Sequence, residues 1–441
     1  MAELSAAKGE ETTGDPRVEG AAAPGGGVLT LVIFAAIILL STANRNVVSV
    51  LVAPIQKAMH VNDAAMGALA GMSFTLVYAT VAFPMARLAD RGNRRSIVAV
   101  AVLIWSVMTA LCGAAANYLL LFLGRMGVAV GEACAYPAQM SMVGDLFPLE
   151  RRGGAISVIW IGSAIGTAFG AYAAGRLNDL YGWQVVFFAF GAPGLLVVLA
   201  LLAFVREPLR DAHGGGEGAA AAVSSTWRED VVRLAAIPSA GVLLLAGGVL
   251  NLAFFVSLAW LPAFLMRTEG LSATAAGGIF GAASSPAILG ILAAGFISDR
   301  LAAKAPRRRL QLMAALLAAA VPALCVMLIT RDPKVFFAAM VVYAFLTGPS
   351  AALLPAAYLD VTPSRLCGSM MAASRFCADV IGGGLGPLAV GALSDALKPA
   401  YGAEALRYAL ITIPAGMALA ALTLLWSARY ADQDARAAAG G

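Results

Sequence analysis

The sequence is poor in charge and in the residues that build most catalytic and metal centres. Only 12% of its 441 residues are Asp, Glu, Lys or Arg, and its two histidines, His60 and His213, lie in separate polar segments. So little polar surface cannot cover a soluble globule of this size. No metal-ligand cluster occurs, and no Gly-x-x-x-x-Gly-Lys-Ser/Thr loop is present to bind nucleotide phosphates. We therefore expect no metal, no cofactor and no enzyme activity.

Cysteine is also scarce, and its copies show no pairing pattern. The five are odd in number and lie in or beside apolar segments: Cys112, Cys134, Cys325, Cys367 and Cys377. No disulfide framework is predicted. The net charge of +5 comes from basic residues in short loops, where retention of Lys and Arg on one side of a membrane explains them. A nucleic-acid partner is not expected.

What the sequence has in abundance is apolar residues in runs of helix length. Hydrophobic residues make up 60% of the chain, and the runs are too long for the alternating ten-residue strands of a membrane barrel. The predicted fold is an all-α membrane protein with twelve transmembrane helices in two six-helix bundles. The predicted spans are 28–56, 64–88, 96–116, 118–146, 153–176 and 183–205, then 239–266, 272–300, 310–330, 333–359, 367–394 and 404–428.

The polar segments define the domains. Residues 1–27 are acidic and rich in Gly and Pro, which predicts a disordered cytoplasmic tail ahead of the first bundle, 28–205. Residues 206–238 form a linker with a predicted amphipathic helix from Trp227 to Leu234, and 429–441 follow the second bundle, 239–428, as a second tail. With both termini in the cytoplasm, the inner segments hold 20 Lys and Arg and the outer ones seven. The Arg, Ala and Gly bias fits a bacterial source, hence an inner membrane.

The two halves repeat each other. Leu88-Ala89-Asp90-Arg91 returns as Ile297-Ser298-Asp299-Arg300, and Asp145, Pro148 and Gly153 return as Asp360, Pro363 and Gly368. Gly175-Arg176-Leu177-Asn178-Asp179 returns as Gly391-Ala392-Leu393-Ser394-Asp395. Parallel repeats of this kind are how many transporters build a site at the interface of two bundles.

Five charged residues lie inside predicted spans and away from the span ends, where an unpaired charge is costly. They are Arg45, Arg125, Glu132, Arg375 and Asp379. Each costs roughly 2.5 to 3.5 kcal/mol at the centre of a bilayer unless it is paired or wetted. Arg125 and Glu132 are seven residues apart and share a helix face, and Arg375 and Asp379 have the spacing of a same-face ion pair. The alternative readings are a hydrogen-bonded structural acid for Glu132 and a neutralised structural pair for Asp379.

The loop Ala86-Arg87-Leu88-Ala89-Asp90-Arg91-Gly92-Asn93-Arg94-Arg95 resembles the signature between the second and third helices of the major facilitator superfamily. An acid at a helix end can pair with Arg across the bundle and meet a helix N-terminus, which would lock one side of a transporter until the halves rock. The resemblance assigns gating to Asp90, Arg91, Arg94, Arg95, Asp145, Arg151, Asp299 and Arg300.

A narrower resemblance, over residues 35 to 428, is to the Spinster-like branch. It rests on Gly124-Arg125, Val130-Gly131-Glu132-Ala133, Asp145-Leu146-Phe147, Asn93, Arg206-Glu207-Pro208, Gly386-Pro387 and Leu406-Arg407-Tyr408-Ala409-Leu410. It implies a carrier of lysophospholipid- or sphingolipid-like substrates, coupled to protons through an Asp of the first helix and the Glu of the fourth. Here the first helix reads Asn44-Arg45 instead of Asp-Arg, which removes that titratable group and leaves proton coupling open.

The predicted function is secondary transport by alternating access. Among the five charged residues inside the spans, three are Arg and two are acids, so one positive charge is in excess. That excess favours an amphipathic organic anion, a lysolipid first and an aromatic or sugar acid second. Its predicted binding residues are Asn44, Arg45, Arg125, Tyr136 and Arg375, with Glu132 and Asp379 for proton coupling. A non-coupled lipid scramblase or a membrane sensor on the same fold is the alternative. We expect a monomer in the bilayer whose partners are this anion and protons.

Overall fold

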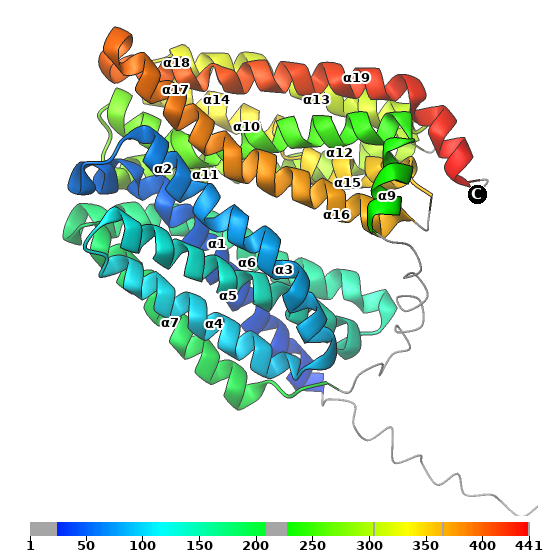
Figure 1. The fold of residues 1–441 in the computed structure, drawn as a ribbon, viewed down its shortest axis with the longest axis horizontal. Helices are drawn as coiled ribbons and strands as arrows, with labels where there is room; N and C mark the ends of the chain where they lie inside the picture. The colour runs from blue at the N-terminus through cyan, green and yellow to red at the C-terminus, as the bar shows by residue number, and fades with distance from the viewer. Residues whose placement is uncertain (1–23, 209–226, 303–304, 364–365, 440–441) are drawn as a thin grey trace, which may run out of the picture.

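The computed structural model describes residues 24–208, 227–302, 305–363 and 366–439, and all the regular elements among them are helices. Ten stretches of these residues are long and apolar enough to cross a membrane. The last stretch, Cys367–Ala438, is 72 residues long and folds back on itself in two antiparallel arms (Figure 1). A further helical arm, Asp63–Arg91, packs beside the helix that carries Glu132. The twelve predicted spans are accounted for in this way.

The first bundle contains seven helices because its second span is interrupted at Gly71. They are α1 (Pro24–Met59), α2 (Asp63–Ala70), α3 (Met72–Arg91), α4 (Arg94–Gly113), α5 (Tyr118–Leu146), α6 (Leu149–Tyr181) and α7 (Trp183–Phe204). Asparagine side chains begin three of them: Asn62, Asn93 and Asn117 each accept a hydrogen bond from the backbone N–H three residues on. These caps satisfy N–H groups that a helix start leaves without partners.

The second bundle repeats this arrangement with more interruptions. Its elements are α10 (Pro238–Thr268), α11 (Ala273–Ser284), α12 (Ala287–Ala302), α13 (Arg307–Ile329), α14 (Pro333–Thr347), α15 (Ser350–Asp360), α16 (Cys367–Cys377), the π-helix η2 (Ala378–Leu385), α17 (Gly386–Tyr401), the 3-10 turn η3 (Gly402–Glu404), α18 (Ala405–Leu410) and α19 (Thr412–Ala439). A short helix, α9 (Trp227–Ala235), precedes it, where the sequence predicts an amphipathic linker helix.

The chain remains helical beyond the predicted end of the last span. α19 continues to Ala439, and its Asp434 Oδ2 accepts a hydrogen bond of 2.9 Å from the backbone N–H of Ser239, near the start of α10. Asp432 likewise accepts from the backbone N–H of Arg307, at the start of α13, at 2.9 Å. The segment predicted as a tail from residue 429 is therefore docked on the second bundle over its described part. Of the tail predicted at 1–27, residues 24–27 belong to the start of α1, and 1–23 lie outside the described residues.

The glycine run near residue 383 widens its helix instead of breaking it. Residues 378–385 form a π-helix between α16 and α17. A Cβ at Gly382 would lie 2.8 Å from atoms of Asn251 on α10, and one at Gly383 would lie 2.8 Å from the Thr75 hydroxyl on α3. Bare backbone thus lets this helix touch both bundles at once, and π segments are common at functional sites.

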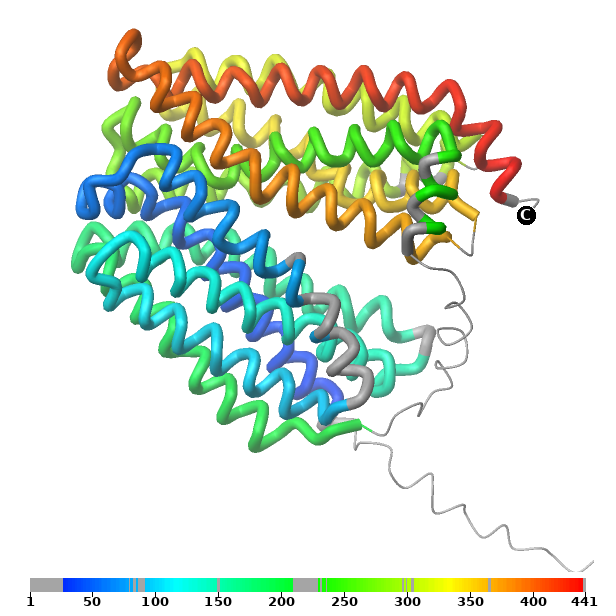
Figure 2. Tube along the Cα trace, viewed as in Figure 1, coloured from blue at the N-terminus to red at the C-terminus, as the bar shows by residue number. Residues whose placement is uncertain are grey.

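The two bundles meet at one end and diverge at the other (Figures 1 and 2). We call the end where α2 and α11 begin the joined end, and the end beside α9 the splayed end. Two seams make the join: α2 packs on α17, and α6 packs on α11. Both depend on glycines, because a Cβ at Gly67, Gly175, Gly277 or Gly391 would lie 2.2 to 2.3 Å from a backbone oxygen of the opposite bundle. Gly67 and Gly391 lie at the α2–α17 seam, and Gly175 and Gly277 lie at the α6–α11 seam.

We predict that Gly175→Ala and Gly391→Ala loosen the joined end. The added methyl overlaps backbone, which cannot swing aside, and overpacking of this kind costs about 1–3 kcal/mol. Melting of the purified protein, followed by tryptophan fluorescence, should report the loss. Gly153→Ala is the matched control, because a Cβ there meets nothing within 4 Å. Equal melting temperatures for the seam and control variants would contradict the argument.

Candidate functional site

The first bundle holds a buried acid against an arginine near the middle of α1. The Glu132 side chain is 1% exposed, and its Oε2 accepts hydrogen bonds from Arg45 Nε at 2.6 Å and Ser41 Oγ at 2.8 Å. Ser41 and Arg45 are one turn apart, so α1 presents both donors to α5. Both donors thus bind the same carboxylate oxygen of Glu132. Nothing in the sequence pattern had pointed to Ser41.

Two aromatic rings of α3 lie on the other side of Arg45. The guanidinium carbon of Arg45 is 4.3 Å from the ring centre of Phe74 and 5.4 Å from that of Tyr78, and the two rings stack at 5.5 Å. These distances are those of cation–π contacts. They hold the guanidinium in place while leaving 34% of the side chain exposed. Phe74 and Tyr78 were absent from the sequence-based site, although their one-turn spacing is a signal that could have been used.

The second bundle adds a second arginine–acid pair facing the first. Arg375 Nε donates to Asp379 Oδ2 at 2.6 Å, as the one-turn spacing predicts. The guanidinium carbon of Arg375 lies 5.6 Å from the Tyr78 ring, which places Tyr78 between two arginines from different bundles. In both pairs the acid engages Nε. Among the described residues, no hydrogen-bond partner is present for the terminal amino groups of either guanidinium.

The other predicted binding residues lie apart from this pair of arginines. Asn44 is 2% exposed and turns to α4, where its Nδ2 donates to Thr109 Oγ1 at 2.7 Å. Arg125 is also 2% exposed, and its neighbour Gly124 packs against Cys112 Sγ, one turn beyond Thr109 on α4. Asn44 Oδ1 and two nitrogens of Arg125 have no hydrogen-bond partner in the described structure. The two residues thus share a buried layer against α4.

Tyr136, half-buried on α5, lies nearer the boundary between the bundles. Its ring meets that of Trp160 edge-on, with 6.3 Å between centres, and Tyr78 and Arg375 are among its neighbours. Of the predicted binding residues, the structure therefore gathers Arg45, Arg375 and Tyr136 around Tyr78. Arg125 and Asn44 lie apart from this group, in the buried layer against α4.

At the splayed end, Arg94 ties the first bundle together. Its side chain is 1% exposed and binds Asp145, Ser141 Oγ at 3.0 Å and Glu207 Oε1 at 2.7 Å. Glu207 Oε2 also accepts from the backbone N–H of Arg95 at 2.7 Å. These contacts join the start of α4 to the end of α5 and to the segment after α7. Arg94 and Asp145 lie within one bundle, so they brace that bundle and do not bridge the two.

The same brace occurs in the second bundle. Arg309 Nη1 donates to Asp360 Oδ2 at 2.8 Å, and its Nε donates to Ser298 Oγ at 3.0 Å. Arg309 follows Arg94 by 215 positions, the same offset as Asp360 from Asp145. Sequence comparison had missed this equivalence, because the basic loop before Arg309 is longer than the loop before Arg94.

The remaining predicted gating residues are placed as follows. Arg151 and Arg300 are exposed at the splayed end, and the side chains of Asp90, Arg91 and Asp299 lie outside the described residues. The neighbour of Arg151, Arg152, is the residue that caps α5: it donates to the carbonyl oxygens of Phe147 and Gly144 at 3.0 and 2.6 Å.

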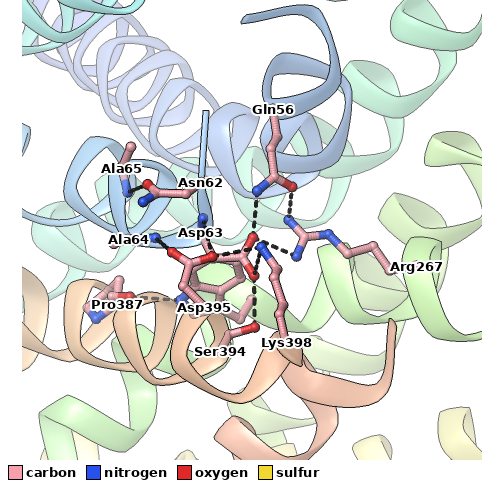
Figure 3. Close-up of polar contacts among 11 residues, drawn as sticks. Gln56, Asn62, Asp63, Ala64, Ala65, Arg267, Pro387, Ser394, Asp395 and Lys398 are labelled. Carbon is pink, nitrogen blue, oxygen red and sulfur yellow. Dashed lines mark hydrogen bonds and ion pairs between the residues drawn. The ribbon is translucent and has the colours of Figure 1, made fainter. Parts of the chain in front are cut away.

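The joined end carries a polar cluster that sequence analysis did not treat as a site (Figure 3). Asp395 on α17 crosses to the first bundle and caps α2, accepting from the backbone N–H groups of Asp63 at 3.1 Å and Ala64 at 2.8 Å. Asp179 on α6 does the same for α11, accepting from the backbone N–H of Thr274 at 2.8 Å and from its hydroxyl at 2.6 Å. These are the two aspartates that end the repeated Gly-x-x-x-Asp segment. The recurrence of this segment was the signal in the sequence. The structure explains it, because the aspartate of each bundle caps a helix of the other bundle.

The comparisons with known proteins agree with this architecture. The family model described as Major Facilitator Superfamily matches residues 33–387. A Mycolicibacterium smegmatis protein described as an MFS-type efflux pump is 32% identical over 396 residues, which are 89% of this chain and 90% of that protein. Protein spinster homolog 1 of Rattus norvegicus is 29% identical over 252 residues, 56% of this chain and 47% of its own length.

Among solved structures, a bacterial homolog of the human lysosomal transporter Spinster, described as inward-facing and unoccupied, superposes with a TM-score of 0.79. The alignment is 24% identical and covers 95% of this chain and 98% of that one. The family match spans well over half of the chain. The chain therefore belongs to the Major Facilitator Superfamily of secondary transporters, and within it resembles the Spinster proteins.

Proposed function

We propose that the protein carries an amphipathic organic anion, bound between Arg45 and Arg375, by alternating access. The observation that carries this proposal is the position of Tyr78 between two guanidinium groups, one from each bundle. Each guanidinium keeps its terminal amino groups free of described partners while an acid holds its Nε. A planar fork with free N–H groups suits carboxylate or phosphate. An anion bound by both bundles at once can shift the equilibrium between two arrangements of the bundles, which alternating access requires.

The charge balance of the core supports an anion. Arg45, Arg125 and Arg375 face only two acids, Glu132 and Asp379, which leaves one positive charge over. Asp145 and Asp360 were the acids that could have cancelled it. Both are engaged at the splayed end, by Arg94 and Arg309 respectively. Neither is therefore placed to neutralise the central arginines.

The rings around the arginines favour a substrate with an apolar part. Phe74, Tyr78, Tyr136 and Trp160 cluster near Arg45 and Arg375, and aromatic walls with a few placed charges are typical of sites for small organic molecules. A lysolipid has both the anionic head and the apolar tail, and it is our first candidate. An aromatic or sugar acid is the second. The likeness to spinster homolog 1 and to an efflux pump is consistent with the first candidate.

The shape of the molecule supports rocking of two rigid bundles. Cross-bundle contacts involve the glycine seams and the aspartate caps at the joined end, whereas the braces at the splayed end stay within each bundle. With the orientation that the Lys and Arg distribution predicts, the splayed end faces the cytoplasm, and we propose that this is the inward-open state in a bacterial inner membrane. The joined end is then the outer end.

Coupling to protons, in this proposal, runs through Glu132 and Asp379. Each acid is held by an arginine that would also bind the substrate, so an anion and a proton can exchange places at the same site. An anion on Arg45 weakens the hold on Glu132, and protonation of Glu132 frees Arg45. Asn44 cannot take part as an acid. It does stand in the same buried layer as Arg125, where an Asp would supply a counter-charge.

We predict that anionic amphiphiles stabilise the purified protein and that cationic ones do not. Removing a hydrogen-bonded charge typically costs about 1.5–3 kcal/mol, so Arg45→Ala and Arg375→Ala should each weaken binding roughly 10- to 100-fold. Thermal shift with matched anionic, zwitterionic and cationic amphiphiles measures this, with Arg300→Ala, at the splayed end, as control. Stabilisation by the cationic compound alone, or indifference to both central replacements, would disprove an arginine-bound anion.

Glu132→Gln should weaken the pH dependence of transport and leave the part that runs through Asp379, because the amide keeps the shape of the side chain but cannot exchange a proton. The measurement is uptake into proteoliposomes across imposed pH gradients. Wild type should accumulate substrate against its gradient, whereas a scramblase only equalises it and a sensor moves nothing. Asp332→Asn, which alters an acid at the outer end of α14, is the control. An unchanged pH profile in Glu132→Gln would remove this residue from coupling.

Asn44→Asp should increase the response of uptake to a pH gradient. The new carboxylate would face the buried layer that contains Arg125, whose two unpartnered nitrogens could bind it. Thr109→Ala removes the present partner of Asn44 without adding an acid, and we expect that variant to keep the wild-type response. If Asn44→Asp transports with the wild-type pH dependence, Asp379 alone or uncoupled transport becomes the better account.

A further inference from the structure

A second cationic site exists at the outer end, formed around Arg267 and Lys398, and one of the protein's own carboxylates fills it (Figure 3). The Asp63 side chain is 0% exposed and engages four donors. Its Oδ1 accepts from Gln56 Nε2 at 2.6 Å and from Arg267 Nη1 at 2.8 Å. Its Oδ2 accepts from Ser394 Oγ at 2.7 Å and pairs with Lys398 Nζ at 3.1 Å. Each carboxylate oxygen of Asp63 thus has two donors.

Three of the four donors belong to the second bundle, while Asp63 belongs to the first. Arg267 ends α10, and Ser394 and Lys398 lie one turn apart on α17. The packing of the second bundle holds them in place: the Arg267 guanidinium lies 5.7 Å from the Trp260 ring, and Trp260 Nε1 donates to the carbonyl oxygen of Pro387 at 3.0 Å. The donors therefore form a set that the second bundle keeps when the first moves away.

Separation of the bundles at this end would separate opposite charges. The second bundle would keep Arg267, Lys398 and Asp395, with one positive charge in excess, while the first would keep Asp63. The ammonium of Lys398, the hydroxyl of Ser394 and the guanidinium of Arg267 would then face the outside, and Asp63 would no longer lie among them. Such a set matches the chemistry of carboxylate and phosphate.

We propose that Arg267, Ser394 and Lys398 form an outer binding subsite for the anionic head of the substrate, which Asp63 occupies while the outer end is closed. The substrate class rests on the proposed function. In this arrangement Asp63 and the substrate compete for the same donors. An anion from outside therefore opens the lock and keeps it open, and its departure toward the central arginines lets Asp63 return.

The other seam shows that this set is not required by the repeat. Asp179 caps α11 as Asp395 caps α2, and the counterpart of Asp63 at that seam is Ala273, because the backbone oxygens of these two residues face the seam glycines Gly391 and Gly175. At that seam the side-chain partners of Asp179 in the described structure are the neutral residues Thr274, Asn178 and Ser272. Closing a seam thus needs glycines and a cap only. The buried Asp63 with its two cations is present at the α2–α17 seam in addition to the glycines and the cap. An anion-binding role would account for it.

The test measures opening of the outer end in the full-length protein. Spin labels at Lys57→Cys and Ala400→Cys, both exposed at that end, are placed in a chain whose five native cysteines are replaced, and their separation is measured by pulsed electron resonance. Octyl phosphate is the anionic probe and octyltrimethylammonium its cationic match. Asp63→Asn should populate a longer separation. If Asp63 leaves the subsite free in about one molecule in ten, octyl phosphate should act at an about tenfold lower concentration in this variant.

Further variants separate the subsite from simple loosening. Arg267→Gln with Lys398→Gln, added to Asp63→Asn, should keep the long separation and lose the response to octyl phosphate. Lys398→Gln alone, at a half-exposed residue, should weaken the response of the wild-type chain if the other variants fold poorly. Asp179→Asn should loosen its seam without changing the concentration at which octyl phosphate acts. Equal effective concentrations in wild type and Asp63→Asn, or a response that survives loss of both cations, would overturn the proposal.

Failure here is distinguishable from failure of the central site. The spin-label measurement is repeated in Arg45→Ala. Loss of thermal stabilisation without loss of the outer response supports both sites. An outer response with no dependence of binding on Arg45 or Arg375 in the thermal assay would reject the central site alone. A dependence on Arg45 together with an outer end that ignores octyl phosphate would reject the outer subsite alone.

Discussion

An ionised side chain inside a bundle of apolar helices is stable only when a counter-charge, a hydrogen bond or water solvates it, and this constraint arranges the whole protein. The buried carboxylates of Glu132 and Asp63 are each bound by at least two donors, and each includes an arginine. Arginine has several N–H groups in a fixed fork, so it can hold an acid with one and keep others for a ligand. In the proposed mechanism, the same charges that need a partner inside the bundle also bind the substrate and take part in the movement of the bundles.

The location of each pair decides what it does. Arg94–Asp145 and Arg309–Asp360 lie within single bundles and make each bundle a rigid body. Arg267–Asp63 crosses between bundles and must break if the joined end opens. Arg45–Glu132 and Arg375–Asp379 lie within bundles but beside the same tyrosine, so a ligand there can pull on both. Rigid bodies, a breakable cross-link and a shared central site are the components that rocking requires.

Duplication explains the scaffold, and departures from it mark the chemistry. The glycine seams, the aspartate caps and the arginine braces occur in both halves at nearly constant offsets. Arg45 with its α3 rings, the π segment that carries Asp379, and the buried Asp63 lack such counterparts in the contacts described. A symmetrical pair of bundles supplies two equivalent end states, whereas the unequal groups give the ligand a preferred position in each.

The sequence by itself determined the helical class, the two bundles, the family and the one central ion pair that follows helix spacing, Arg375–Asp379. Local rules suffice for these, because hydrophobic length sets a span and a one-turn spacing places Arg375 by Asp379. Tertiary structure alone decided which partner Arg45 takes, that Asn44 turns to Thr109, that Arg309 is the counterpart of Arg94, and that Asp63 crosses to Arg267. These pairings join residues between 51 and 204 positions apart, and one-dimensional periodicity carries no information about which faces of two distant helices come into contact.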